Sequence, residues 1–333
     1  MKNRKITMDS IAEKLNISKV SVHKALHGYP GISEQLKACV ISAAAELGYS
    51  LVDPLTKLCR NYFYLIPQRF YLSTEQYYAG IYSELSAILE NIGSKLEHVT
   101  VRKNFSLSQF AATNSRLNKG AFGVFWAGII PEGILAQFSS QYEIPFVCID
   151  YRSDKYPANY VFIDNYHSGY ILTNSLIQKG HTNICAIIDI QSASTNADKY
   201  FGFRKALLEN GIDFTPDMHI NLSLASPHEF LNLRLPEKLP SAFILGSDFA
   251  AFNFMTTMMN NGRRIPADIS VASFDNTRLS LECTPKLTTI GPEFSDIAKA
   301  CYTIMLQTLL NRKKKSTFIL QSILHERASV KSV

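Results

Sequence analysis

With 333 residues, 46% of them hydrophobic and 19% charged, the chain is expected to form two or three globular domains. No apolar run approaches the roughly 18 residues of a membrane-spanning helix, and no apolar segment follows the basic start, so we expect neither a membrane protein nor a signal peptide. Residues 1–60 hold nine Lys/Arg and five Asp/Glu, and so carry +4 of the net charge of +6. This excess is either a solvated basic face or a footprint for phosphates.

The first predicted elements are three short helices within residues 7–48. Thr7 is placed to cap the first helix, Ser18 follows a tight Asn16–Ile17 turn and caps the second, and the third starts at Ser33. Gly28 and Gly48 are the expected ends of the second and third helices. The expected buried residues are Met8, Ile11, Ala12, Leu15, Val22, Ala25, Leu26, Leu36, Val40, Ala43, Ala44 and Leu47. Because each helix is too short to be stable alone, the three predict one helix-turn-helix module.

The second helix of such a module enters the major groove of DNA. Lys19 can donate to guanine, and Val20 can contact a thymine methyl group. The alternatives are a helical hairpin used for protein contacts and, for the histidines, solvated surface positions. The residues expected to contact DNA in this module are Thr7, Ser18, Lys19, Val20, Ser21, His23, Lys24, His27 and Ser33.

The stretch "ITMDSIAEKLNISKVSVHKALHG…ISEQLKACVISAAAELGYS" resembles the DNA-binding headpiece of the LacI/GalR transcription regulators. The family pattern is a Thr-led helix, then "VS..TVS..LN", then "V...T...V..A...LGY", and nearly every position matches. The departures are His23 and His27, where the family usually has Ser and Asn, and Lys24, where Arg is common.

Residues 50–60 resemble the family less. In the family this hinge becomes a helix on operator DNA and inserts a leucine into the minor groove. Here "YSLVDPLTKL" lacks the usual Pro-Asn and Ala-Arg, although Asp53 and Pro54 form a good helix start. Leu58 falls at the position of the inserted leucine, which implies a DNA contact there. The alternative is a plain linker.

From residue 61, strand-like and helix-like segments alternate. The expected strands are "YFYLI", "AFGVFWA", "IPFVCID", "NICAIID", "SAFILGS", "SVASFD" and, after an exposed "RKKK" turn, "TFILQSIL". The expected helices between them are "EQYYAGIYSELSAILENIG", "HSGYILTNSLIQKG" and "KYFGFRKALLENG". This order is typical of doubly wound α/β layers, and about 270 residues suit two lobes with a ligand in the cleft between them.

The core also resembles the LacI/GalR family, in "VFIDNYHSGYILTNSLIQKGHTNICAI", "KYFGFRKALLENGI", "GSDFAAFNFMTTMMNNGRRIPADISVASFDN", "TPKLTTI" and "SILHERAS". The resemblance spans the chain. It implies an all-α helix-turn-helix headpiece joined to an α/β two-lobe core of the periplasmic-binding-protein type. It further implies a dimeric repressor controlled by a ligand. The expected divisions are headpiece 1–49, hinge 50–60 and effector-binding and dimerisation domain 61–333, with lobes of about 61–160 plus 292–316 and about 161–291 plus 317–333.

The resemblance also implies an effector site. Lys199 stands where the family has a pocket arginine, Ser247 replaces the asparagine of "AND", and Asp275 matches the first aspartate of "GFDD". Asp164 lies near the lobe crossover and is at least as well explained as a helix cap. Carboxylates, a cation and aromatic rings suit a sugar, but the two replacements point to an effector other than the common hexoses. The expected effector-binding residues are Gln68, Arg69, Tyr71, Asp150, Lys199, Ser247 and Asp275.

The sequence was also searched for motifs of enzymes and metal sites. The chain contains no GxSxG, GxGxxG, GxxxxGK[ST], HExxH or CxxC motif, so we expect no enzyme, no catalytic residue, no metal site and no cofactor. Four of the six scattered cysteines lie in apolar runs, which indicates reduced thiols in the cytoplasm. The expected partners are a pseudo-palindromic double-stranded operator and a small-molecule effector of the carbohydrate class, and no membrane is expected. A regulator that answers to a protein stays open as an alternative.

The helix "DFAAFNFMTTMMNNG" predicts self-association. Its apolar residues Phe252, Phe254, Met255, Met258 and Met259 cover an arc wider than the roughly 100° stripe that a one-sided helix needs. Met and Phe are also enriched at interfaces. We therefore expect a two-fold homodimer that presents two recognition helices to the operator.

Overall fold

The computed structural model describes residues 6–27, 31–49, 61–68, 76–102, 105–113, 122–140, 144–222, 233–311 and 315–333. The described residues divide into two compact units. The first unit lies within Met1–Gln68, Ile81–Val161 and Ser295–Phe318, and the second within Arg69–Gly80, Phe162–Phe294 and Ile319–Val333. No helix among the described residues is long and apolar enough to cross a membrane.

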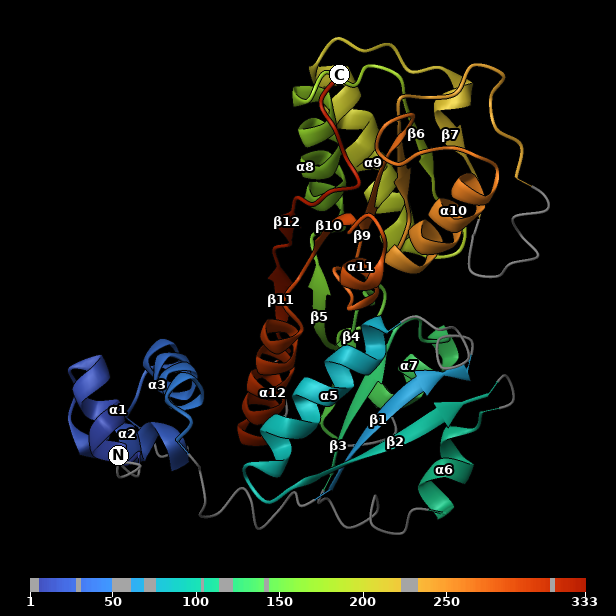
Figure 1. Cartoon of the computed structure of the whole chain (residues 1–333). Coiled ribbons are helices and arrows are strands. Elements are labelled where there is room, and N and C mark those ends of the chain that lie inside the picture. Colours follow the sequence, from blue (N-terminus) through green and yellow to red (C-terminus); the bar gives the residue numbers. More distant parts are fainter. Residues whose placement is uncertain are drawn as a thin grey trace. The chain divides into compact units, whose positions relative to one another are not determined.

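The N-terminal segment holds three helices, drawn in blue in Figure 1: α1 (Met8–Leu15), α2 (Lys19–His27) and α3 (Glu34–Leu47). Ile11, Val22 and Val40, one from each helix, are fully buried and form their common core. Asn16 ends α1 in a left-handed conformation with φ 52°, which permits the tight turn into α2. The three helices therefore stabilise one another, as the sequence predicted for elements of this length.

The helix ends follow the predicted capping chemistry. Ser18 Oγ accepts the backbone N–H of Ser21 at 3.0 Å, and Ser33 Oγ accepts that of Leu36 at 3.2 Å. Gly48 ends α3 at φ 67°, a left-handed conformation that glycine adopts without a steric penalty. Gly28 lies outside the described residues. The residues expected to be buried but found only partly so are Met8, Leu15, Leu36 and Leu47.

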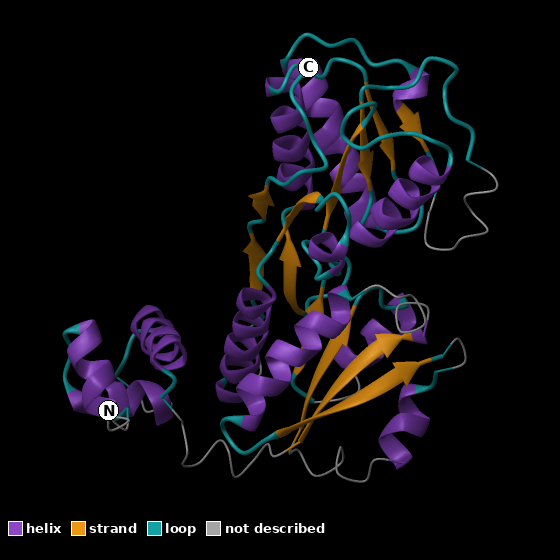
Figure 2. Cartoon of the chain, in the orientation of Figure 1, coloured by secondary structure: helices purple, strands orange, loops and turns teal. Residues whose placement is uncertain are grey.

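The first sheet has the strand order β11-β5-β4-β3-β1-β2. The strands are drawn in orange in Figure 2. Its strands are β1 (Asn61–Pro67), β2 (Lys95–Val101), β3 (Phe122–Ala127), β4 (Phe146–Ile149), β5 (Asn159–Ile163) and β11 (Thr317–Leu320). The pairs from β2 through β5 are parallel. The helices of this part of the chain are α5 (Tyr77–Glu90), α6 (Leu107–Thr113), α7 (Glu132–Ser140) and α12 (Phe294–Leu310). Residues 62–66 of β1 are all buried, as expected for a strand covered on both faces.

The second sheet has the order β12-β10-β9-β8-β6-β7, and β12 is antiparallel to β10. Its strands are β6 (Ile184–Ile187), β7 (His219–Ile220), β8 (Ala242–Leu245), β9 (Ser270–Phe274), β10 (Thr288–Gly291) and β12 (Ile323–His325). The helices are α8 (Asn165–Gln178), α9 (Ser194–Glu209), α10 (Asp248–Asn260), α11 (Leu279–Glu282) and the 3₁₀ turn η2 (Pro216–Met218).

Helices cover both faces of this second sheet. On one face, Leu172 of α8 and Phe203 of α9 pack with Ile244 of the sheet. On the other face, Phe254 of α10 packs with Phe243. Successive strand residues point to opposite faces, so the apolar run of each strand fills two cores at once. This arrangement confirms the predicted fold class, a helical N-terminal segment followed by a two-sheet α/β core.

One sequence prediction was wrong. The run "TFILQSIL" was expected to be a single strand, but the structure splits it into β11 and β12, which belong to different sheets. Gln321 and Ser322 separate the two strands. An apolar run specifies that a segment pairs with a sheet, but it does not specify which sheet.

The described cysteines carry free thiols. Cys148, Cys185, Cys283 and Cys301 are buried, whereas Cys39 is exposed, and Cys59 lies outside the described residues. Burial raises the pKa of the Cys185 thiol to about 12, which keeps it in the unreactive thiol form.

Candidate effector and DNA-binding sites

The candidate effector residues of the second unit gather at the carboxyl edge of its parallel strands. Ser247 follows β8, Asp275 follows β9, and Lys199 lies on α9, the helix that comes after β6. In open α/β sheets, ligands bind outside the carboxyl ends of the strands. Because β8 and β9 are neighbours in the sheet, the turns that follow them lie beside each other, although Ser247 and Asp275 are 28 positions apart in the sequence.

Lys199 and Asp275 form an ion pair. Lys199 Nζ donates to Asp275 Oδ1 at 3.2 Å and to the backbone oxygen of Gly246 at 2.9 Å. Lys199 is only 7% exposed, and its ammonium lies 4.8 Å from the centre of the Phe274 ring. A buried ammonium needs such partners, because an unpaired charge away from water is costly. The structure thus brings together two residues that lie 76 positions apart in the chain.

The backbone that carries Asp275 is unusual. Asp275 has φ 100° and Asn276 has φ 49°, both in the left-handed half of conformational space. The Asp275 N–H donates to the Ile290 oxygen of β10 at 2.9 Å. Gly291 of β10 lies so close that a Cβ on it would stand 2.5 Å from the Asp275 carbonyl carbon. Strained backbone of this kind persists only where the surroundings enforce it, and it concentrates at binding sites.

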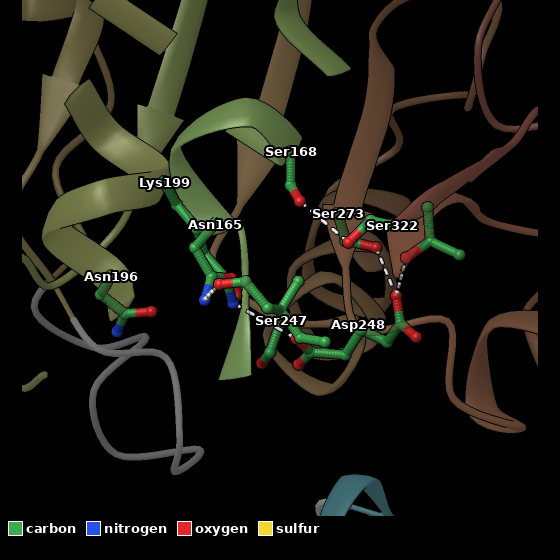
Figure 3. A network of polar contacts seen from close by, with 12 residues as sticks. Asn165, Ser168, Asn196, Lys199, Ser247, Asp248, Ser273 and Ser322 are labelled. Carbon is green, nitrogen blue, oxygen red and sulfur yellow. Dashed lines mark hydrogen bonds and ion pairs between the residues drawn. The ribbon is translucent and has the colours of Figure 1, made fainter. Parts of the chain in front are cut away.

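Asp248, at the start of α10, is the central acceptor of this edge (Figure 3). It is fully buried, and Oδ1 accepts the hydroxyls of Ser273 and Thr289, both at 2.6 Å. Oδ2 accepts the Thr277 N–H at 2.6 Å and the Thr277 hydroxyl at 2.9 Å. Burial, and then the neighbouring Asp275 carboxylate, raise the pKa of Asp248 to about 6, although its hydrogen bonds act in the opposite direction.

Asp248 should make the stability of the protein depend on pH. Because its pKa rises from 3.8 in the unfolded chain to about 6, the folded state binds its proton more tightly. The stabilisation from that proton is fully present below about pH 4 and is lost as the pH rises through about 6. We expect the unfolding free energy of the wild type, minus that of Asp248→Asn, to fall by about 3 kcal/mol across this window. Urea unfolding of both proteins measures it, and a difference independent of pH would contradict the assignment.

Ser247 and Asp164 both cap helices. Ser247 Oγ accepts the Ala250 N–H at 3.2 Å at the start of α10. Asp164 Oδ1 accepts the His167 N–H at 2.9 Å at the start of α8, which is one of the two roles that the sequence left open for it. A residue in an N-cap position presents its polar atoms at a helix N-terminus, where ligand oxygens also bind well.

The other effector candidates belong to the first unit. Asp150 follows β4 with φ 56°, and its N–H donates to the Val161 oxygen at 2.8 Å. Gln68 follows β1 and is exposed. Arg69 and Tyr71 lie outside the described residues. The structure therefore places Lys199, Ser247 and Asp275 at one edge of the sheet of the second unit. Asp150 and Gln68 belong to the first unit.

Most of the predicted DNA-contacting residues in and around α2, the predicted recognition helix, are exposed. Val20 is 63% exposed, a large apolar side chain left in solvent on the first turn. Lys19 Nζ is paired with Asp9 Oδ2 of α1 at 2.8 Å, and both side chains are more than half exposed. The remaining exposed candidates are Thr7, Ser18, His23, Lys24 and Ser33, whereas Ser21 is partly exposed. The side chain of His27 and the hinge residues 50–60, including Leu58, lie outside the described residues.

Sequence reasoning missed Asp248, Asn276 and Arg327. Asp248 follows the predicted strand "SAFILGS" directly, and a carboxylate just after a buried strand is a signal that marks this edge. Arg327 belongs to the motif "SILHERAS", but nothing local to that motif points to the loop it contacts. Among the described residues, no group of three or more His, Cys, Asp or Glu side chains is arranged to hold a metal ion.

The chain resembles known regulators along its whole length. Residues 173–330 match the family model of the periplasmic binding protein-like domain. The chain is 26% identical over 330 residues to the HTH-type transcriptional repressor PurR of Pectobacterium carotovorum subsp. carotovorum, covering 97% of this chain and 96% of the relative. A PurR of Photorhabdus laumondii subsp. laumondii is also 26% identical, over 337 residues, with the same coverage.

Solved structures share the fold. The regulator CelR in complex with cellobiose superposes with a TM-score of 0.66 at 21% identity, covering 97% of this chain and 99% of that one. The lac repressor dimer bound to operator and the anti-inducer ONPF gives a TM-score of 0.65 at 20% identity, covering 98% of this chain and all of that one.

A helix-turn-helix segment joined to a periplasmic-binding-protein-like core defines a DNA-binding regulator under ligand control, a class whose members are not enzymes. The chain resembles the LacI/GalR family of transcriptional regulators along its whole length.

Proposed function

We propose that this protein represses transcription by binding a pseudo-palindromic operator, and that a carbohydrate effector controls its affinity for that operator. The observation that carries the proposal is the buried Lys199–Asp275 pair at the carboxyl edge of the second sheet, in a chain that also carries a helix-turn-helix. This role belongs to the cytoplasm, where the operator DNA lies. No cofactor enters the proposal.

The chemistry of the edge supports a polyhydroxylated ligand. The Asp275 carboxylate accepts hydrogen bonds from hydroxyl groups, and the Lys199 ammonium donates to them. CelR has been solved with cellobiose, a disaccharide. Lys199 and Ser247 lack the forked hydrogen bonding of the family's arginine and asparagine, so we expect an effector other than the common hexoses.

A panel of sugars tests the effector. Glucose, cellobiose and other mono- and disaccharides are added to the full chain, and the melting temperature is followed. A ligand that binds the native state at about 100 times its Kd stabilises it by about 2.7 kcal/mol. An effector must also change the affinity for a selected operator fragment, since it acts only by preferring one conformation. If no sugar raises the melting temperature, the carbohydrate proposal fails.

Self-association rests on α10. Of the five apolar residues on its wide arc, Phe254, Met255 and Met258 are buried in the core of their own unit. Phe252 and Met259 remain 37% and 39% exposed, seven positions apart and so on the same helical face. We propose that this exposed face contributes to a homodimer, the state in which the lac repressor structure was solved. Light scattering at micromolar concentration should give a dimer, and a monomer would refute the assembly.

Lys19 is expected to contact a base of the operator. In Lys19→Ala we expect a loss of discrimination at one position of each operator half-site, worth about 1–3 kcal/mol, if Lys19 contacts a guanine. The operator is first selected from random DNA, and binding is then measured for single base changes. Asp9→Ala is the matched control, because it removes the partner of the ion pair and keeps the lysine. An equal loss on all sequences would assign Lys19 to phosphate instead.

A further inference from the structure

Arg327, two residues beyond β12, reaches into the loop that carries Asp275. Its Nη2 donates to Asn276 Oδ1 at 2.9 Å, and its Nη1 donates to the Leu287 backbone oxygen at 2.7 Å and to Ser280 Oγ at 3.0 Å. The Arg327 N–H donates to Thr288 Oγ1 at 2.9 Å. Each of these acceptors is a neutral oxygen, so the guanidinium acts here as a rigid fork that fixes geometry.

Asn276 is the residue that needs to be held. It has φ 49°, and its neighbour Asp275 has φ 100°. Asparagine visits the left-handed region at modest cost, but aspartate at φ 100° is strained and relaxes unless the loop around it is fixed. The Asn276 N–H meets Thr289 Oγ1 only at 3.3 Å, a long hydrogen bond. The firmer contact of Asn276 is the one that its side chain makes with Arg327.

The other side of the loop is fixed by Asp248. Asp248 accepts the N–H and the hydroxyl of Thr277, and so holds the residue after Asn276. Arg327 ties Asn276 to the stretch between α11 and β10, through Leu287. With Asp248 holding Thr277 and Arg327 holding Asn276, the Asp275 carboxylate points at Lys199, and its Oδ1 lies 3.2 Å from Lys199 Nζ.

We propose that Arg327 is a positioning residue for the effector site, which holds Asn276 and thereby keeps the Asp275 carboxylate paired with Lys199. The inference rests on the proposed function only in calling this edge an effector site. The positioning itself is a property of the folded chain and is measurable without a ligand. Loss of the fork lets the Asp275–Asn276 backbone relax, so the carboxylate leaves its place at Lys199.

A double-mutant cycle measures this positioning. Lys199→Met, Asp275→Ala and the double variant are made in the wild-type background and again in Arg327→Met, and their melting temperatures are compared. In the wild-type background the two shifts should be strongly non-additive, because the residues contact each other. We expect more than half of that non-additivity to disappear in Arg327→Met. A purely structural Arg327 would lower all the melting temperatures and leave the non-additivity unchanged.

Two further variants and a control test whether the loss of non-additivity comes from the Arg327–Asn276 contact. Asn276→Gly removes Oδ1, the oxygen that accepts the Arg327 hydrogen bond. Because glycine adopts φ 49° freely, we expect this variant to fold even if Arg327→Met does not. We expect it to lose the same non-additivity, and to lose no more when it is combined with Arg327→Met. Arg327→Lys should fail to restore it, because a single ammonium does not reproduce the fork. Arg278→Met is the matched control, since Arg278 of the same region is 81% exposed and pairs with Glu282.

The outcomes separate this inference from the proposed function. Full non-additivity in both Arg327→Met and Asn276→Gly overturns the positioning role, whatever the sugar panel gives. Loss of non-additivity in both, with Arg278→Met unchanged, supports it even if no sugar binds. If the non-additivity is lost but no sugar binds, the carbohydrate proposal fails and the positioning of Asp275 by Arg327 stands.

Discussion

Asp275→Ala is expected to abolish the response to the effector while operator affinity stays close to that of the wild type. The carboxylate is the acceptor we assign to ligand hydroxyls, and the predicted DNA-contacting residues of the described part of the chain lie in or beside the N-terminal helices. Calorimetry with the sugar identified by the panel measures the first effect, and a gel shift with the selected operator measures the second. Unchanged affinity for the effector would remove Asp275 from the site.

The same substitution should also lower stability, because it leaves the buried Lys199 ammonium without its carboxylate partner, although the hydrogen bond to the Gly246 oxygen remains. Breaking one side of a buried pair costs about 3 kcal/mol or more. Replacing both partners avoids that cost, so the Lys199→Met/Asp275→Ala protein should regain stability without regaining the response. Asp296→Ala, which removes an exposed carboxylate paired with Lys299, is the control and should change the stability by less than about 1 kcal/mol.

Gly202→Ala is expected to lower the unfolding free energy by a similar amount, about 3 kcal/mol or more. A Cβ at Gly202 of α9 would stand 2.0 Å from the Tyr166 backbone oxygen of α8. A Cβ at Gly169 of α8 would stand 2.1 Å from the Lys199 oxygen, so the two helices touch backbone to backbone at this crossing. Because both obstacles are backbone atoms, α9 must move as a whole to admit a methyl group.

Urea unfolding measures the loss, and Gly133→Ala provides the control. Gly133 lies in α7, and a Cβ there would meet no atom within 4 Å. Alanine at Gly133 should therefore stabilise that helix by up to about 1 kcal/mol. Lys199 lies one turn before Gly202, so Gly202→Ala should also weaken effector binding. A Gly202→Ala protein as stable as Gly133→Ala would show that the crossing of α8 and α9 is not fixed by these glycines.

The limits of the N-terminal helices, several of the buried strands and the resemblance to the family could be read from the residues in order. Ser18 and Ser33 mark helix starts because a cap acts on a backbone N–H only two or three residues away. Most of the buried strands were visible as apolar runs for a similar reason, since a strand covered on both faces needs apolar side chains throughout. The edge strands β2 and β7 were not predicted, and neither were the inner strands β5 and β10.

Only the tertiary structure decided how the candidate site is assembled. Asp248 binds Ser273, Thr277 and Thr289, which lie 25, 29 and 41 positions away, and Lys199 meets Asp275 across 76 positions. The sequence by itself determined which residues of the second unit carry charge and which segments form its parallel strands. It did not determine the partners of those charges. The reason is physical: capping and periodicity act within one turn or one strand, whereas these contacts depend on the order β10-β9-β8-β6, which brings the turns after separate strands to one edge.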